Sequence, residues 1–324
     1  METSVLYRED FLLNSRGVKL FTCTWLPASK KIKALVFLCH GYGVECSLFM
    51  KGTGIRLAQS RFAVFGIDYE GHGKSDGIRC YIKRFSDIVD DCADYFKSIR
   101  EKEEYKDKAR FMLGESMGGA VALQIHRKQP LDWNGAILVA PMCKISEEMK
   151  PSPLMISILS KLSTVFPTWK IVPTRDIIET GFKDPLKREE MRSNPYVYQD
   201  KPRLRSGLEL LNASLDLEQR LNEVTLPFLV LHGEADVVTD IAISKALHEE
   251  ASSFDKTLIT YPGMWHGLLV GETQDNIDLV MRDITEWLNK RSPSVGSSGS
   301  SPSLLTHSHL SLIHHASKDD LHQI

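Results

Sequence analysis

Continuous apolar runs alternate with amphipathic stretches along most of this 324-residue chain. Each run ends in glycine, proline or polar residues, as expected of strands that are buried on both faces. These predicted strands cover residues 34–41, 62–73, 110–116, 135–141, 227–236 and 256–267. Before them, residues 11–27 predict a hairpin whose turn is the segment 14–17.

Helical periodicity follows several of the predicted strands. Apolar positions three and four residues apart predict helices at residues 86–104, 118–128, 241–250 and 276–289. Ser86 is suited to cap the first of these helices, and Pro130 ends the second. Repeated strand–helix units predict a mostly parallel sheet covered by helices on both faces.

One stretch, residues 142–222, interrupts this rhythm. It is rich in proline, methionine and basic residues and contains an apolar segment at 153–169. Two interpretations compete, a cap inserted over the active site and a continuation of the main sheet, and the absence of strand patterns favours the cap. We therefore predict one domain over residues 1–291 with this insertion. A tail rich in Ser, Gly and His follows at 292–324, and its composition predicts disorder.

The composition is that of an ordinary globular protein, with 42% hydrophobic and 25% charged residues. The net charge of -2 and the scattered basic residues argue against nucleic-acid binding. The sequence shows no signal-peptide pattern and no run of about 18 apolar residues, so we expect a cytoplasmic protein. The six cysteines form no CxxC pair, which predicts reduced thiols and no metal site.

The strongest chemical motif is Gly-Glu-Ser-Met-Gly at residues 114–118, between a predicted strand and a predicted helix. This is the context that a G-x-S-x-G nucleophile turn requires. The turn is sharp, so its glycines prevent side chains from colliding, and the helix directs its positive end toward developing negative charge. We predict Ser116 as the nucleophile, and the alternative is a plain strand-to-helix loop.

A serine hydroxyl needs a base, and the base needs an acid that orients it. In a sheet of this kind the order along the chain is Ser, then Asp or Glu, then His. Asp236 and His266 stand at the carboxyl ends of the last two predicted strand segments, at the edge where active sites assemble, so we predict them as acid and base. Glu234 and Asp240 are rivals for the acid. The other histidines considered are predicted to be structural or to face solvent: His72, His126, His232 and His248.

A tetrahedral oxyanion needs two preorganised donors, usually backbone N–H groups. We predict the N–H of Met117, directly after the nucleophile, as one donor. The second is expected in the loop His-Gly-Tyr-Gly at 40–43, where glycines on both sides favour the N–H of Tyr42. The alternative for this loop is a turn that merely ends a strand.

Together these segments resemble the monoacylglycerol lipase family, most closely its plant branch, which includes caffeoylshikimate esterase and proteins labelled lysophospholipases. The resemblance spans roughly residues 10–290 and rests on five segments in the family's order: 40–43, 71–77, 114–119, 233–236 and 261–266. It implies the α/β-hydrolase fold, an inserted cap with an apolar acyl tunnel, and no cofactor. It assigns the catalytic residues and oxyanion donors as follows: Ser116, Asp236, His266, Tyr42 and Met117.

The head-group region differs from the animal members of that family. They carry a Glu and an Arg just after the His-Gly corner, whereas residues 44–49 contain no Arg and a displaced Glu. This difference concerns recognition of glycerol and leaves ester hydrolysis untouched. The residues expected near the substrate are Glu45, Phe49, Leu154 and Ile158.

The sequence thus predicts a serine carboxylic-ester hydrolase that acts on a monoacylglycerol or a similar lipid ester through an acyl-enzyme. A phenylpropanoid ester and a lysophospholipid stay open as substrates, as does acyl transfer to an acceptor other than water. A non-catalytic binding protein of the same fold is the alternative from another class. Segment 154–169 predicts either peripheral membrane contact or packing over the acyl pocket, and the oligomeric state is not predicted.

Overall fold

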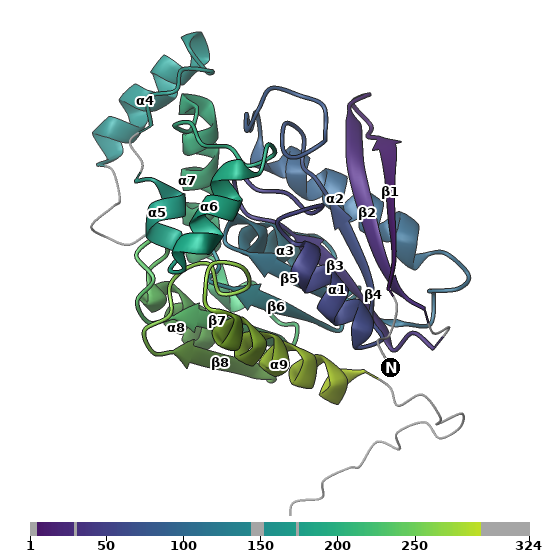
Figure 1. The fold of residues 1–324 in the computed structure, drawn as a ribbon. Coiled ribbons are helices and arrows are strands. Elements are labelled where there is room, and N and C mark those ends of the chain that lie inside the picture. The colour runs from purple at the N-terminus through teal and green to yellow at the C-terminus, as the bar shows by residue number, and fades with distance from the viewer. Residues whose placement is uncertain (1–4, 29–30, 144–151, 173–174, 293–324) are drawn as a thin grey trace, which may run out of the picture. The chain divides into compact units, whose positions relative to one another are not determined.

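A computed structural model of the chain describes residues 5–28, 31–143, 152–172 and 175–292. Within these residues an eight-stranded sheet has the order β1-β2-β4-β3-β5-β6-β7-β8 (Figure 1). The strands are β1 Val5–Leu13, β2 Lys19–Pro27, β3 Ala34–Cys39, β4 Ala63–Ile67, β5 Ala109–Glu115, β6 Gly135–Val139, β7 Phe228–Gly233 and β8 Lys256–Tyr261. β2 pairs antiparallel with β1 and β4, and all other pairs are parallel. The predicted hairpin and mostly parallel sheet are confirmed.

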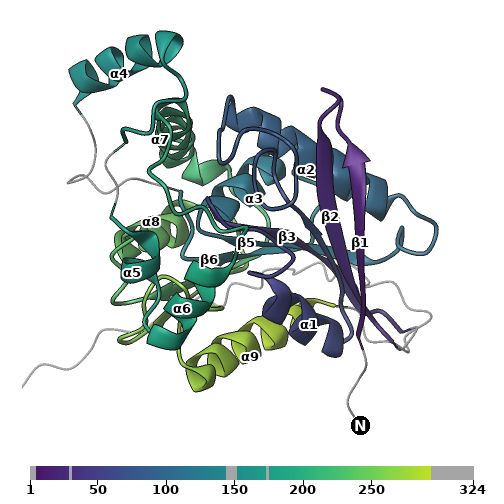
Figure 2. The ribbon, with the colours of Figure 1, turned by 45° about the horizontal axis from the view of Figure 1, so that its top comes forward.

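Helices cover both faces of the sheet, as Figures 1 and 2 show. Their bounds are α1 Lys51–Gln59, α2 Phe85–Arg100, α3 Met117–Lys128, α8 Ile241–Glu250 and α9 Gln274–Arg291. Buried side chains of α1 and α9 join one hydrophobic cluster, and those of α2, α3 and α8 join a second. β3, β4, β6 and β7 are buried along their whole length, which explains their unbroken apolar sequences.

Further helices lie between β6 and β7, and we call this set the insertion. In the described residues they are α4 Pro153–Val165, α5 Ile177–Gly181, α6 Pro185–Ser193 and α7 Leu204–Glu218, followed by a 3-10 turn at Leu221–Glu223. No described residue between these two strands joins the sheet. One apolar face of α4 packs on α7 through these side chains: Ile156, Leu159 and Leu162 against Leu204, Leu208 and Leu211.

The start of α2 differs from the prediction. The helix begins at Phe85, with Arg84 as N-cap and no side-chain cap, so the expectation that Ser86 caps it is wrong. Instead, the Phe85 N–H donates to Glu209 Oε2 of α7 at 2.8 Å. A carboxylate from the insertion thus accepts the hydrogen bond of a free N–H at the start of α2, the role that a capping serine usually has. The same bond links α7 to α2.

Three further observations concern the predicted tail, membrane spans and metal sites. The tail lies outside the described residues from 293 onward. Of the helices that the structure describes, none is long and apolar enough to cross a membrane. Across the same ranges no group of three His, Cys, Asp or Glu side chains is arranged to hold a metal ion. All six cysteines are buried free thiols.

Candidate active site

Ser116 lies in a strained turn between β5 and α3. Its φ of 54° falls in the left-handed region that non-glycine residues rarely adopt. Backbone hydrogen bonds hold the turn against the end of β6. The Ser116 N–H donates to Val139 O, and Ser116 O accepts from the Met142 N–H, each at 2.9 Å. The strand–turn–helix context expected of a nucleophile is therefore present.

The two glycines of the motif are required by close approach of backbone segments. A Cβ at Gly118 would lie 1.8 Å from Cys39 O, and a Cβ at Gly114 would lie 2.3 Å from Gly118 O. Such contacts are far shorter than real Cβ contacts, so neither position accepts a side chain unless β3 or α3 moves. The G-x-S-x-G spacing thus has a steric cause in this fold.

Asp236 and His266 meet at the edge of the sheet where the chain leaves β7 and β8. His266 Nδ1 lies 2.7 Å from Asp236 Oδ2, and the Asp236 side chain is fully buried. Because an ionised carboxylate only accepts, Nδ1 is the donor, and Nε2 of the neutral ring is left to accept a proton. Asp236 Oδ1 also accepts hydrogen bonds from the Val238 and Thr239 N–H groups.

These contacts shift the pKa values of Asp236 and His266 in opposite directions. Burial alone would raise the pKa of Asp236, but the charge on His266 and the hydrogen bonds from His232, His266 and Val238 lower it well below its usual range. Burial acts to lower the pKa of His266, but the Asp236 carboxylate outweighs this effect and raises it above its ordinary value. Asp236 is thus the charged acceptor at neutral pH, and it strengthens His266 as a base.

His232, predicted to be structural, supports this pair. It is fully buried on β7, with Nδ1 2.7 Å from Ser244 Oγ and Nε2 3.1 Å from Thr239 O. Its Nε2 also lies 3.3 Å from Asp236 Oδ2. Thr239 Oγ1 donates to the same carboxylate oxygen at 2.8 Å. Sequence reasoning missed both supports, because they reach Asp236 only when the loop after β7 folds back on the strand.

A carboxyl group that sequence reasoning missed lies directly beside Ser116. Glu115, the last residue of β5, is 3% exposed, and its Oε2 is buried with no hydrogen-bond partner among the described residues. Burial raises the pKa of Glu115 to about 7, although the charge on His266 acts to lower it. The only sequence signal for this group is its position directly before Ser116.

The loop after β3 approaches Ser116 closely. A Cβ at Gly41 would lie 3.5 Å from Ser116 Cβ. The hydrogen bonds of the described backbone use neither the Tyr42 N–H nor the Met117 N–H. Met117 begins α3, so its N–H also lies at the positive end of that helix. The two predicted oxyanion donors are therefore unused N–H groups on segments next to Ser116.

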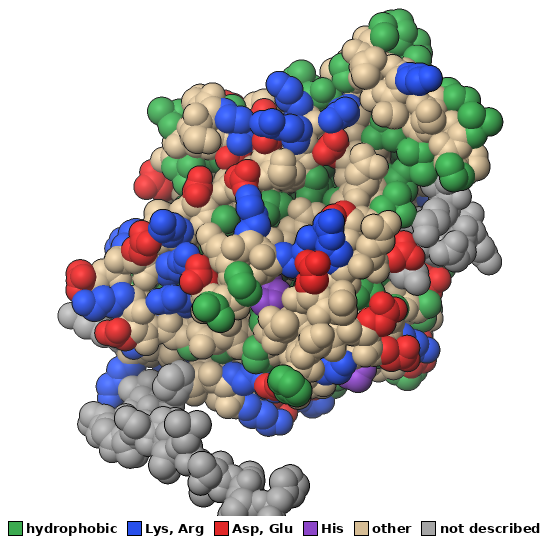
Figure 3. Space-filling model, turned by 180° about the vertical axis from the view of Figure 1, so that it is seen from behind, with side chains coloured by type: hydrophobic (Ala, Val, Ile, Leu, Met, Phe, Trp, Pro, Cys, Tyr) green, Lys and Arg blue, Asp and Glu red, His purple; other side chains and the backbone are tan. Residues whose placement is uncertain are grey.

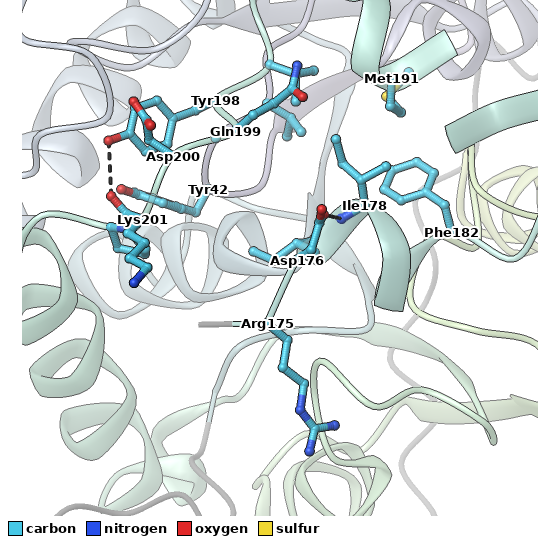
Figure 4. Close-up of a pocket in the computed structure, with 15 residues that line it drawn as sticks. Tyr42, Arg175, Asp176, Ile178, Phe182, Met191, Tyr198, Gln199, Asp200 and Lys201 are labelled. Carbon is cyan, nitrogen blue, oxygen red and sulfur yellow. Dashed lines mark hydrogen bonds between the residues drawn. The ribbon is translucent and has the colours of Figure 1, made fainter. Parts of the chain in front are cut away.

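A pocket of about 220 Å³ opens between this loop and the insertion (Figure 4). Its lining combines apolar and polar side chains, among them Tyr42, Asp176, Ile178, Phe182, Met191, Val197, Tyr198, Gln199 and Lys201. The Tyr198 N–H donates to Gly43 O at 2.7 Å, which joins the insertion to the loop. At the end of α5, a Cβ at Gly181 would lie 3.6 Å from His266 Cβ. One segment that borders the pocket therefore approaches Ser116 and another approaches His266, although neither of these two residues lines the pocket itself.

Glu45, predicted near the substrate, is fully buried in the turn after β3. Its carboxylate accepts hydrogen bonds from the N–H groups of Leu48 at 2.9 Å and Phe49 at 2.8 Å, and from Ser47 Oγ at 2.7 Å. Asn194 Nδ2 of the insertion adds a contact at 3.2 Å. Glu45 therefore holds the turn together and does not line the pocket.

The other three residues predicted near the substrate also lie outside this pocket. Phe49 is buried, with its ring centroid 6.3 Å from that of Phe182. Leu154 and Ile158 are 72% and 51% exposed, because α4 turns its other apolar face toward α7. Apolar residues lie on both the packed and the exposed side of α4, so their residue types do not show which of them are buried.

A family model described as serine aminopeptidase, S33, matches residues 30–274. The chain belongs to this hydrolase family. One relative of the S33 chain is a caffeoylshikimate esterase of Arabidopsis thaliana, 38% identical over 280 residues that cover 86% of this chain and 84% of that protein. Another is a monoglyceride lipase of Mus musculus, 30% identical over 285 residues that cover 88% and 91%. The resemblance predicted from the motifs is confirmed.

Solved structures give the same assignment of the fold. A soluble variant of monoglyceride lipase from Saccharomyces cerevisiae, in complex with a substrate analogue, matches the S33 chain with a TM-score of 0.78 at 20% identity. The match covers 91% of this chain and 98% of that chain. At this identity the likeness concerns the fold alone. The S33 chain has the α/β-hydrolase fold, as predicted.

Proposed function

We propose that this S33 hydrolase cleaves carboxylic esters with Ser116 as nucleophile, His266 as general base and acid, and Asp236 as the residue that orients His266. The observation that carries the proposal is the 2.7 Å contact between His266 Nδ1 and Asp236 Oδ2, at the sheet edge that holds the Ser116 turn. The His266 ring bonds to Asp236 and Thr239 among the described residues, and we expect Ser116 Oγ to approach Nε2 when substrate binds.

The reaction would proceed through an acyl-enzyme. His266 Nε2 takes the Ser116 proton as Oγ attacks the ester carbonyl, and then returns it to the leaving alcohol. Water, activated by the same nitrogen, cleaves the acyl-enzyme and releases the acid. The N–H groups of Tyr42 and Met117 stabilise the oxyanion in both steps. One such donor contributes on the order of 100- to 1000-fold in turnover.

A monoacylglycerol is the first substrate that we propose. The monoglyceride lipase relative at 30% identity supports it. One wall of the pocket is apolar, and Ile178, Phe182 and Met191 on that wall are suited to contact an acyl chain. In this interpretation the insertion acts as a cap over the ester.

A phenylpropanoid ester is the second candidate. It is favoured by the 38% identity to a caffeoylshikimate esterase. The pocket also presents two aromatic rings, Tyr42 and Tyr198, and the polar side chains of Gln199 and Lys201, which suit an aromatic acid or a polar alcohol. The carboxylate of Glu45 is fully used by the protein, so it is not available to a glycerol head group. A lysophospholipid is a third class for the same triad.

A product assay with the purified protein separates these candidates. We expect oleate release from 2-oleoylglycerol, and no release in Ser116→Ala. Cleavage of caffeoyl shikimate alone would move the assignment to a phenylpropanoid esterase, and cleavage of lysophosphatidylcholine alone would move it to a lysophospholipase. A folded protein that cleaves none of the three would contradict the proposed function and favour a binding protein.

We also propose that α4 contacts a membrane surface. Its inner face packs on α7, but Leu154, Ile158 and Val165 are 72%, 51% and 67% exposed. Figure 3 shows from behind that apolar side chains gather over this part of the insertion. Lys161 is the only charged residue of the helix. A helix whose exposed side carries several large apolar side chains and a single charge suits a lipid interface.

Replacing both Leu154 and Ile158 with serine should weaken binding to phosphatidylcholine vesicles several-fold, since each apolar side chain gains free energy by leaving water. Sedimentation with vesicles measures this. The matched control is Leu131→Ser, because Leu131 is 96% exposed and lies outside the insertion. Equal binding by the control and the double variant would contradict the membrane contact.

The electrostatic coupling between Glu115 and His266 predicts how kcat/KM depends on pH. The base must be neutral, so kcat/KM should fall as pH drops through the raised pKa of His266. Above about pH 7 the Glu115 carboxyl is ionised, and its charge raises the pKa of His266. Glu115→Gln removes this charge, so the acidic limb should move to lower pH. A profile of kcat/KM against pH on a soluble ester measures the limb, and Glu234→Gln, an exposed carboxylate, serves as the control. An unmoved limb in Glu115→Gln would contradict the coupling.

A further inference from the structure

A second hollow lies next to the site pocket. It has a volume of about 480 Å³ and is lined by Arg79, Lys170, Arg203 and the segment 197–200. The same segment lines the site pocket, so it forms a wall common to both. Three of the lining side chains are cations, and Asp200 is the one carboxylate among them. The proposed ester hydrolysis uses none of these charged groups.

Backbone carbonyls hold the two arginine side chains in place. Arg79 donates to Gly73 O at 3.1 Å and to Tyr196 O at 2.7 Å. Arg203 donates to Arg79 O at 3.1 Å and to Thr168 O at 3.0 Å. Neither guanidinium is in an ion pair with a carboxylate of the described residues, and both are half-buried. The hollow therefore contains two oriented positive charges that no carboxylate in the described part of the chain neutralises.

Lys170 adds a third cation, which bonds to Asp200. The two side chains are 43% and 59% exposed, and an exposed pair of this kind contributes about 0–1 kcal/mol. The pair can therefore open for a stronger anion. A phosphate group fits the remaining donors, because planar guanidinium groups match its oxygens and the lysine supplies a further charge.

The surroundings of the hollow favour a phosphate that is carried by a lipid. Trp169 precedes Lys170, and its ring stacks on Phe166 with centroids 4.0 Å apart. These rings are 45% and 39% exposed. The Leu204 N–H donates to Trp169 O at 2.7 Å, directly beside Arg203, which ties the aromatic pair to the rim of the hollow. Exposed aromatic rings next to cations suit the level of lipid head groups, and Phe166 directly follows α4.

We propose that Arg79, Lys170 and Arg203 bind a phosphate group, and that its carrier is an anionic lipid in the membrane that α4 contacts. The bound head group would fix the insertion, and with it the entrance of the site pocket, against the bilayer. This inference rests on the proposed membrane contact of α4, and it does not depend on the proposed chemistry at Ser116.

Vesicle sedimentation with and without phosphatidate in phosphatidylcholine tests the site. The full-length protein should prefer the vesicles that contain phosphatidate. Lys170→Gln should reduce this preference about fivefold, the usual effect of one basic residue near an anionic surface. Lys290→Gln removes the same charge from the exposed end of α9, outside the hollow and the insertion, and should change the preference little. Asp200→Asn frees Lys170 and should increase the preference. Thermal unfolding verifies that each variant is folded.

Three outcomes would overturn either the phosphate site or the assignment of its phosphate to a lipid. Equal losses in Lys170→Gln and Lys290→Gln would overturn the site, because overall charge would then explain binding. Binding of inorganic phosphate that Lys170→Gln weakens, with no preference for phosphatidate vesicles, would overturn the lipid source. Absence of any preference for phosphatidate, together with absence of binding of inorganic phosphate, would overturn both. Lys170→Gln should hydrolyse a soluble ester at the rate of the unmodified protein. If no protein in the set hydrolyses it, the proposed function fails and the binding result stands.

Discussion

Replacing Ser116 with alanine is expected to lower kcat for ester hydrolysis by roughly 10⁴- to 10⁶-fold, as for nucleophiles of other catalytic triads. The loss is large because no acyl-enzyme can form without Oγ, whereas the oxyanion donors and the pocket keep only a small part of the rate. The turn should persist, because its hydrogen bonds to Val139 and Met142 use backbone atoms. Initial rates on 2-oleoylglycerol and on a soluble ester measure the effect.

The matched control is Ser98→Ala, an exposed serine on α2 whose hydroxyl donates to Tyr95 O. It should keep the full rate. Labelling with a fluorophosphonate probe gives a second readout, in which Ser116→Ala should lose the label and the control should keep it. Hydrolysis at an undiminished rate in Ser116→Ala would contradict the assignment of the nucleophile.

Replacing Asp236 with asparagine is expected to lower kcat by roughly 10⁴-fold. The amide removes the charge that raises the pKa of His266. It can also donate to Nδ1, which would place the ring proton on Nε2 and leave that nitrogen unable to accept from Ser116. Rates across pH measure the effect, and the loss should persist at alkaline pH because the wrong tautomer is then the cause.

Glu234→Gln and Asp240→Asn are the controls for this change, since both carboxylates were rivals for the acid. Glu234 accepts from Thr260 Oγ1, and Asp240 accepts from the Ala242 N–H at the start of α8. Neither carboxylate bonds to His266 among the described contacts, so both variants should keep nearly the full rate. A loss in Glu234→Gln as large as that in Asp236→Asn would move the acid to Glu234.

The sheet could be predicted well because its signals are local. Strands such as β3 and β7 are buried on both faces and therefore appear as unbroken apolar runs. The predicted run 62–73 extends beyond β4, which ends at Ile67, because it included the polar and glycine-rich corner at 68–73. The candidate triad could be proposed for the same reason, since strand ends and chain order are properties of the sequence.

The details that could not be predicted depend on contacts between distant residues. Ser86 has the right type for a cap, but Glu209, 124 residues away from Phe85, takes that role. Glu45 has the right place for a substrate contact, but its carboxylate is used within its own turn and by Asn194, 149 residues away. No local pattern records such a partner, so both positions were assigned from residue type alone.

The hydrogen bond from the Tyr198 N–H to Gly43 O has a consequence for how selectivity and rate can change. Tyr198 belongs to the pocket wall that is proposed to contact the substrate, whereas Gly43 is next to Tyr42, whose N–H is proposed to bind the oxyanion. A change of that wall to accommodate a new ester would therefore strain the hydrogen bond between Tyr198 and Gly43, which helps to position the Tyr42 N–H. Substrate specificity and kcat are therefore expected to change together. A variant with a new substrate must either keep this hydrogen bond or change the loop 40–43 together with the pocket wall.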